Sequence, residues 1–118
     1  MFRKRSRIFG AAFACLVFTV SDAQADGAPE LMQGAGCMAC HSVDKKLVGP
    51  AFSWIAYRYK GDKSAVPKLT KKIQAGGAGN WNALTGGVPM PPHPQISVEQ
   101  ATIMVKWILS QKPVPVPK

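Results

Sequence analysis

The sequence reads Cys37-Met38-Ala39-Cys40-His41 at its most informative point, where two thiols and an imidazole stand within five residues. On a helical turn, residues i, i+3 and i+4 project from one face, so Cys37, Cys40 and His41 should point the same way. Two thiols so placed can add across the two vinyl groups of one porphyrin edge, and the adjacent imidazole then lies beneath the iron as an axial ligand. The spacing is the c-type haem attachment signal. It predicts one covalently attached haem c.

Two other roles for Cys37, Cys40 and His41 are also compatible with the sequence. The cysteines can form a disulfide or a thioredoxin-like redox pair, but such a pair usually needs a βαβ context, and no alternating strand pattern is present. A zinc site would have to draw on His41 and His93, the two histidines, and tetrahedral closure through the neighbouring Cys40 and His41 is awkward. Haem is favoured because the motif, the predicted export and an undersized core agree.

The N-terminus has the three parts of a secretory signal peptide. Basic residues occupy most of positions 3–7, an almost uninterrupted apolar run covers 8–20, and Ala23-Gln24-Ala25 places small residues where a signal peptidase cuts. The run falls short of the ~20 residues that a membrane span needs. We therefore predict a cleaved signal peptide at 1–25, no permanent membrane anchor, and a periplasmic mature chain at 26–118.

The chain has 118 residues and a formal net charge of +9. At this length we expect one domain, with a core at about 29–112, which argues against a large catalytic machine or a nucleotide-binding two-layer enzyme. Nucleic-acid binding is a poor explanation for the positive charge, because the chain carries an export signal and no recognisable nucleic-acid-binding motif.

The apolar periodicity predicts an all-α fold with four short helices, at 30–34, 51–60, 67–75 and 97–111. The last is marked most clearly, because Ser97 and Gln100 can form a capping box ahead of an apolar stripe. Residues 76–94 are rich in glycine and proline and are predicted to be irregular, and the proline-alternating tail at 113–118 is predicted to be frayed. Four short helices make a thin core, and chains this small usually need a metal, disulfides or a cofactor.

The second axial ligand of such a haem has several candidates. Met32 and Met104 lie on predicted helices, where methionine usually fills the core, and Met38 is trapped between the attachment cysteines. Met90 is flanked by prolines, whose rings restrict the loop in the unfolded chain and lower the entropic cost of fixing the sulfur. We favour Met90, and His93 remains the alternative that would give a bis-histidine iron.

The ordered motifs resemble those of the small bacterial class I monohaem cytochromes c. They are Cys37-Met38-Ala39-Cys40-His41, Val48-Gly49-Pro50, Val88-Pro89-Met90-Pro91-Pro92 and Val105-Lys106-Trp107-Ile108-Leu109-Ser110. The resemblance covers nearly all of 29–112 and implies N- and C-terminal helices that cross beside the haem. It also implies that the Pro50 carbonyl accepts a hydrogen bond from the His41 ring and so orients the imidazole.

The sequence departs from the family pattern in two places. Short members carry a tryptophan that bonds a haem propionate five residues before the ligand methionine, whereas Trp81 stands nine residues before Met90. About four extra residues therefore lie in 82–87, and the expected propionate contact of Trp81 is left open. The family often has an asparagine where this chain has His93.

An iron ligated by His41 and Met90 has no vacant site for oxygen, peroxide or substrate, and a soft sulfur ligand raises its reduction potential. We therefore predict a soluble periplasmic electron carrier rather than an enzyme, working between a membrane respiratory complex and a terminal reductase or oxidase. The alternative is a ligand-binding sensor or a catalytic haem domain in which Met90 is displaced.

Basic side chains are concentrated between positions 45 and 72. They are Lys45, Lys46, Arg58, Lys60, Lys63, Lys68, Lys71 and Lys72. If several of them ring the haem edge, they would steer the protein onto acidic redox partners. The other interpretation is that they are merely solvated helix faces.

Overall fold

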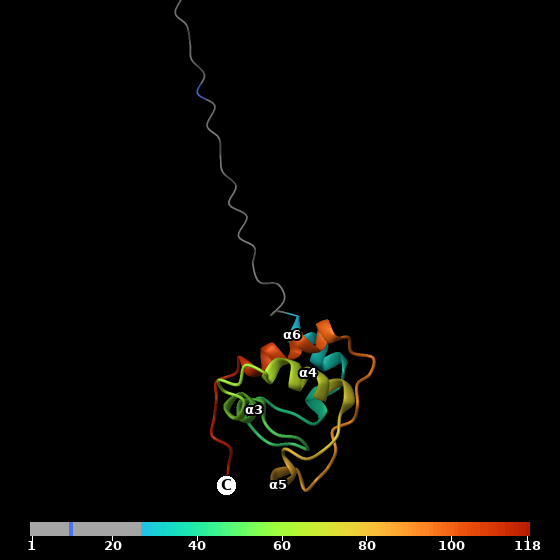
Figure 1. Cartoon of the computed structure of the whole chain (residues 1–118), viewed down its shortest axis with the longest axis vertical. Helices are drawn as coiled ribbons and strands as arrows, with labels where there is room; N and C mark the ends of the chain where they lie inside the picture. Colours follow the sequence, from blue (N-terminus) through green and yellow to red (C-terminus); the bar gives the residue numbers. More distant parts are fainter. Residues whose placement is uncertain (1–9, 11–26) are drawn as a thin grey trace, which may run out of the picture.

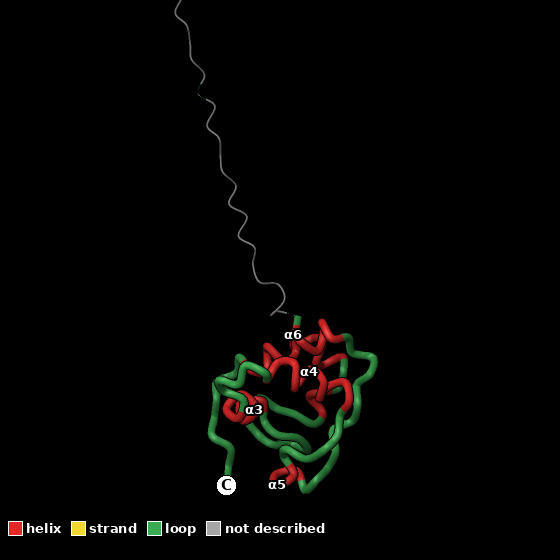
Figure 2. Tube along the Cα trace, viewed as in Figure 1, coloured by secondary structure: helices red, strands yellow, loops and turns green. Residues whose placement is uncertain are grey.

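The computed structural model describes residue 10 and residues 27–118, so the predicted signal peptide lies, apart from Gly10, outside the described residues (Figure 1). The described elements are α2 (Ala28–Gly34), the 3₁₀ turn η1 (Cys37–Ala39), α3 (Phe52–Arg58), α4 (Ala65–Ala75), α5 (Asn82–Thr85) and α6 (Val98–Leu109). Figure 2 shows helices and loops over this range, without a strand. The predicted all-α class is confirmed. Among these residues we find no helix that is both long enough and apolar enough to cross a membrane.

The helix ends follow local signals in the sequence. α2 begins two residues before its predicted start, and Pro29 lies in its first turn, where the missing N–H costs nothing. α4 ends at Ala75, just before Gly76. At the start of α6 the Ser97 side chain accepts from the Gln100 N–H, and the Gln100 side chain accepts from the Ser97 N–H. The predicted capping box is therefore present.

One helical turn lies inside the segment predicted to be irregular. In α5 the N–H groups of Leu84 and Thr85 both donate to the Trp81 carbonyl, and Gly86, with φ 67°, ends the turn in the left-handed region. A single turn is too short to show helical periodicity, which is why the sequence pattern missed it.

The core forms around α6, which contacts α2, α3 and α4. Its buried side chains pack with those of the other three helices; the buried cluster includes Met32, Phe52, Ile55, Ile73, Met104, Val105 and Ile108. Figure 1 shows α2 and α6 at one end of the molecule and α5 at the other. The contact between the first and last described helices is the one that the family resemblance implies.

A backbone hydrogen bond connects the C-terminal tail to α3. The Val114 N–H donates to the Ser53 carbonyl at 3.1 Å, and Figure 1 shows the tail running past α3. The prediction of a frayed tail is therefore wrong at Val114. Proline has no N–H, so the backbone donors of this segment are Val114, Val116 and Lys118, and Val114 donates to a carbonyl of α3.

Candidate functional site

A cavity of about 270 Å³ opens between the helices and the loop that follows α4. Its wall includes all the residues predicted to form the site: Cys37, Cys40, His41, Pro50, Trp81 and Met90. Much of the remaining wall is apolar: Met32, Val48, Phe52, Ile55, Leu69, Ile73, Val88, Met104, Val105 and Ile108. Residues spread over most of the described chain thus converge on one largely apolar chamber.

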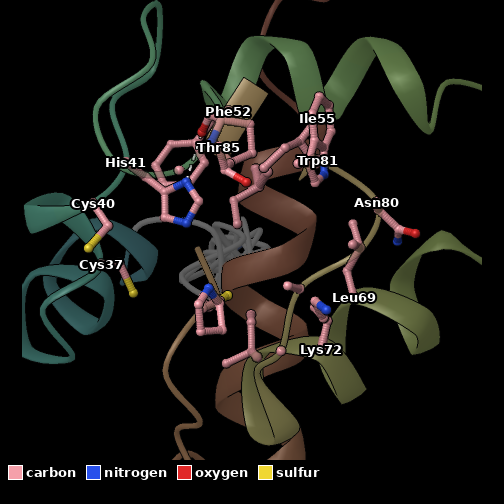
Figure 3. Close-up of a pocket in the computed structure, with 18 of the residues that line it drawn as sticks. Cys37, Cys40, His41, Phe52, Ile55, Leu69, Lys72, Asn80, Trp81 and Thr85 are labelled. Atoms are coloured by element: carbon pink, nitrogen blue, oxygen red, sulfur yellow. Dashed lines mark hydrogen bonds between the residues drawn. The ribbon is translucent and has the colours of Figure 1, made fainter. Parts of the chain in front are cut away.

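The turn η1 places the two thiols. The N–H groups of Cys40 and His41 both donate to the Cys37 carbonyl, at 3.2 and 3.0 Å, so the motif forms one tight turn. Both of these cysteines are free and partly buried. Burial raises the pKa of the Cys37 thiol, which favours its protonated form. Figure 3 shows Cys37, Cys40 and His41 together on one side of the pocket.

The imidazole of His41 is held by two neighbours. Its Nδ1 lies 2.8 Å from the Pro50 carbonyl, and its ring stacks on Phe52 with centroids 5.1 Å apart and an interplanar angle of 20°. A carbonyl only accepts, so Nδ1 carries the hydrogen and Nε2 keeps its lone pair. Burial lowers the pKa of His41, partly offset by the bond to Pro50. The ring is therefore neutral near pH 7, which is the form that ligates a metal.

Gly49 provides the space that this ring occupies. A Cβ at Gly49 would lie 2.6 Å from Cε1 of His41, and the Gly49 N–H donates to the Cys40 carbonyl at 2.7 Å. The backbone thus passes directly against the imidazole. The sequence analysis noted the Val-Gly-Pro motif but assigned a role only to Pro50, because the role of the glycine depends on a distance in space.

Met90 lies at the closed base of a loop. Its N–H donates to the Gly77 carbonyl at 3.0 Å, and the Gly77 N–H donates to the Met90 carbonyl at 2.9 Å. At Gly76, where φ is 65°, a Cβ would lie 2.4 Å from the Met90 carbonyl oxygen. The backbone of Met90 is therefore held by close packing on two consecutive glycines.

His93, the alternative ligand, is not among the residues that line the cavity. Its N–H donates to the Ile73 and Gln74 carbonyls at 3.1 and 3.2 Å, and its Nδ1 is buried without a hydrogen-bond partner among the described residues. Met32 and Met104 do line the cavity, but both are buried members of the core cluster. Of the two candidates left by the sequence, only Met90 reaches the pocket.

Trp81 lines the pocket although it stands nine residues before Met90, farther than in the family pattern. The turn α5 takes up part of the chain between the two residues, so the indole stays at the pocket wall. Figure 3 shows Trp81, Asn80 and Lys72 across the pocket from the two cysteines.

Several polar residues line the pocket wall although the sequence analysis placed none of them there individually. Tyr59 and Asn80 line the pocket, as do Lys68 and Lys72, one helical turn apart on α4. Lys68 also forms an ion pair with Asp62 at 3.1 Å. Two of the eight basic residues between 45 and 72 thus reach the pocket, a grouping that linear spacing did not reveal.

The residues present fit a covalently attached haem. The wall carries two free thiols on one turn, a neutral imidazole with an available Nε2, and a glycine whose missing side chain leaves room for that imidazole. An all-helical chain built around such a chamber defines the class of small c-type haem proteins.

Comparisons with known proteins agree with this class. The family described as Cytochrome c matches residues 25–112. Cytochrome c2 of Rhodocyclus tenuis is 47% identical over 83 residues, which cover 70% of this chain and 89% of that protein. Cytochrome c-552 of Nitrosomonas europaea is 39% identical over 102 residues, which cover 86% of this chain and 91% of that protein. The crystal structure of wild-type Nitrosomonas europaea cytochrome c552 matches with a TM-score of 0.64 and 37% identity, over 70% of this chain and 98% of that chain.

The chain belongs to the cytochrome c family, as a class I monohaem cytochrome c with one covalently attached haem c. Its relatives are electron-transfer cytochromes that work with protein redox partners.

Proposed function

We propose that this chain is a periplasmic electron carrier, with its haem bound through thioethers from Cys37 and Cys40 and ligated by His41 and Met90. One observation carries the ligand assignment: both residues line the same cavity, and the backbone holds each of them independently. We further propose that residues 1–25 are a cleaved signal peptide and 26–118 one domain.

The haem supplies a one-electron iron couple. Residues of this chain would hold the surroundings of the iron in the same arrangement in its ferric and ferrous states. The Pro50 carbonyl fixes the His41 ring, and the paired hydrogen bonds with Gly77 hold Met90. The apolar wall excludes water. With His41 and Met90 as its ligands, the iron would have no open position for a substrate, which supports a carrier rather than an enzyme.

The polar end of the pocket suits the carboxylates of the haem. Trp81, Lys72 and Asn80 lie across the pocket from the cysteines (Figure 3), and the porphyrin edges that bear vinyl and propionate groups are on opposite sides of the ring. We therefore propose that the Trp81 indole N–H and the Lys72 ammonium contact the propionates.

We also propose acidic redox partners, with a membrane respiratory complex as donor and a terminal reductase or oxidase as acceptor. The mature chain is strongly basic, and Lys68 lies at the pocket wall with an exposed side chain. Electron transfer to an acidic redox protein should slow as salt is added, because screening weakens the attraction. A rate that is flat with ionic strength would refute steering.

The ligand assignment is tested with Met90→Ala and its matched control His93→Ala. Met90→Ala should lose the weak near-infrared iron–sulfur band of the ferric protein, lower the reduction potential and allow the ferrous form to bind carbon monoxide. His93→Ala should keep the band. The opposite pattern would assign His93, and rapid carbon monoxide binding by the unmodified ferrous protein would favour the ligand-binding alternative.

A further inference from the structure

At the C-terminal end of α3, Arg58 and Tyr59 contact two consecutive residues, Asn80 and Trp81, of the loop that follows α4. The guanidinium carbon of Arg58 lies 4.6 Å from the ring centroid of Trp81, and Nη1 of Arg58 donates to the Asn80 carbonyl. Nδ2 of Asn80 donates to the Tyr59 hydroxyl at 3.3 Å. We name this set of four residues the clasp.

Within the clasp, Arg58 differs from the other three residues. Tyr59, Asn80 and Trp81 line the cavity, whereas Arg58 does not. Arg58 therefore touches the indole from outside the pocket. Its charge meets an aromatic face and a carbonyl, and no carboxylate of the described residues lies within ion-pair distance of it. A guanidinium stacked on an aromatic face is attracted by the ring electrons, and its fork can donate a hydrogen bond at the same time.

The loop needs such an anchor because α5 packs on none of the other described helices. The base of the loop is closed by the paired hydrogen bonds of Gly77 and Met90, but its far part is held mainly by bonds within itself, such as that from the Gly79 N–H to the Asn82 side chain. Figures 1 and 2 show α5 at the end of the molecule away from α6. The clasp joins this far part to α3.

We propose that Arg58 is a positioning residue that holds Trp81 on the pocket wall, and thereby holds the indole N–H toward the haem carboxylates. The inference rests on the proposed function, because that function gives Trp81 its contact. It adds that the greater spacing between Trp81 and Met90, about four residues more than in the family pattern, is tolerated because a cation outside the pocket keeps the indole in place.

Amide hydrogen exchange on the reduced holoprotein tests the clasp directly. In Arg58→Ala, the amides of Leu84 and Thr85, which both donate to the Trp81 carbonyl, should exchange about tenfold faster, equivalent to about 1.4 kcal/mol. The amides of α6 should be unchanged. Lys60→Ala removes the same charge two residues away, from an exposed side chain, and should leave all these rates unchanged. Equal effects of the two variants, or no effect of Arg58→Ala, would overturn the proposal.

A double-mutant cycle on the reduction potential shows whether Arg58 acts through Trp81. Arg58→Ala should shift the potential in the unmodified background and produce little or no shift when Trp81→Leu is already present. A shift of the same size in both backgrounds would mean that only the charge of Arg58 acts, and would refute a positioning role. Absence of the near-infrared band in the unmodified protein would refute the proposed ligation by Met90. The exchange rates of Leu84 and Thr85 would still show whether Arg58 holds the loop.

Discussion

Replacing Gly76 with alanine should displace the backbone of Met90. The new Cβ would lie 2.4 Å from the Met90 carbonyl oxygen, 2.7 Å from the Pro92 nitrogen and 2.9 Å from the Pro91 carbonyl carbon, whereas ordinary contacts lie at 3.4–4 Å. The facing segment must therefore move by about 1 Å. All three contacts are backbone atoms in a proline-rich segment, which cannot turn aside as a flexible side chain would.

The energetic cost has two parts. The Gly76 backbone, at φ 65° and ψ −153°, occupies a region open essentially only to glycine, and a side chain there costs on the order of 1–3 kcal/mol. Relieving the close contacts costs about 1–3 kcal/mol more, as overpacking usually does. We expect Gly76→Ala to lower the free energy of unfolding by about 2–6 kcal/mol, a large share of the roughly 5–15 kcal/mol typical of a domain.

Guanidinium unfolding of the holoprotein measures the stability, and the ferric near-infrared band reports on the sulfur. The matched control is Gly86→Ala in the same loop, where φ is 67° but a Cβ would meet no atom within 4 Å. Gly86→Ala should cost about 1–2 kcal/mol from left-handed strain alone and should keep the band. If Gly76→Ala kept the band and was no less stable than Gly86→Ala, close packing on Gly76 would not position Met90.

Three further perturbations test other parts of the structure. Gly49→Ala places a Cβ 2.6 Å from His41 Cε1, so haem staining after denaturing electrophoresis should show less holoprotein; an unchanged yield would contradict the role of this glycine. Hydrogen bonds, first from Ser64, lower the pKa of Asp62 from 3.8 to about 2, so its stabilising contribution is complete above pH 3.8 and is lost as pH falls through about 2. Denaturant unfolding of the native protein and Asp62→Asn should therefore differ at neutral pH and converge in acid, and a constant difference would refute this linkage. Deleting 113–118 removes the backbone hydrogen bond from the tail to α3 and should cost about 0.5–1.5 kcal/mol, whereas a deletion that begins after the bonded valine should cost less; equal losses would exclude that bond as the cause.

Local signals predicted much of the fold. The capping box of Ser97 and Gln100 is present, and α4 ends at Ala75, the last residue of the helix predicted at 67–75. The turn α5 was missed because one turn carries no periodicity. The hydrogen bond of Val114 was missed because its acceptor belongs to α3, far away in the chain.

The sequence by itself determined that Cys37, Cys40 and His41 share one turn, because their spacing makes them neighbours through local hydrogen bonds alone. For the proposed second ligand, the sequence left two candidates, Met90 and His93, and could not show which of them lies at the pocket. Only the tertiary structure placed Met90 on the cavity wall and left His93 off it. Only the tertiary structure likewise placed the Arg58 cation beside Trp81. Such contacts depend on how distant segments of the chain pack together, and residue spacing does not determine that packing.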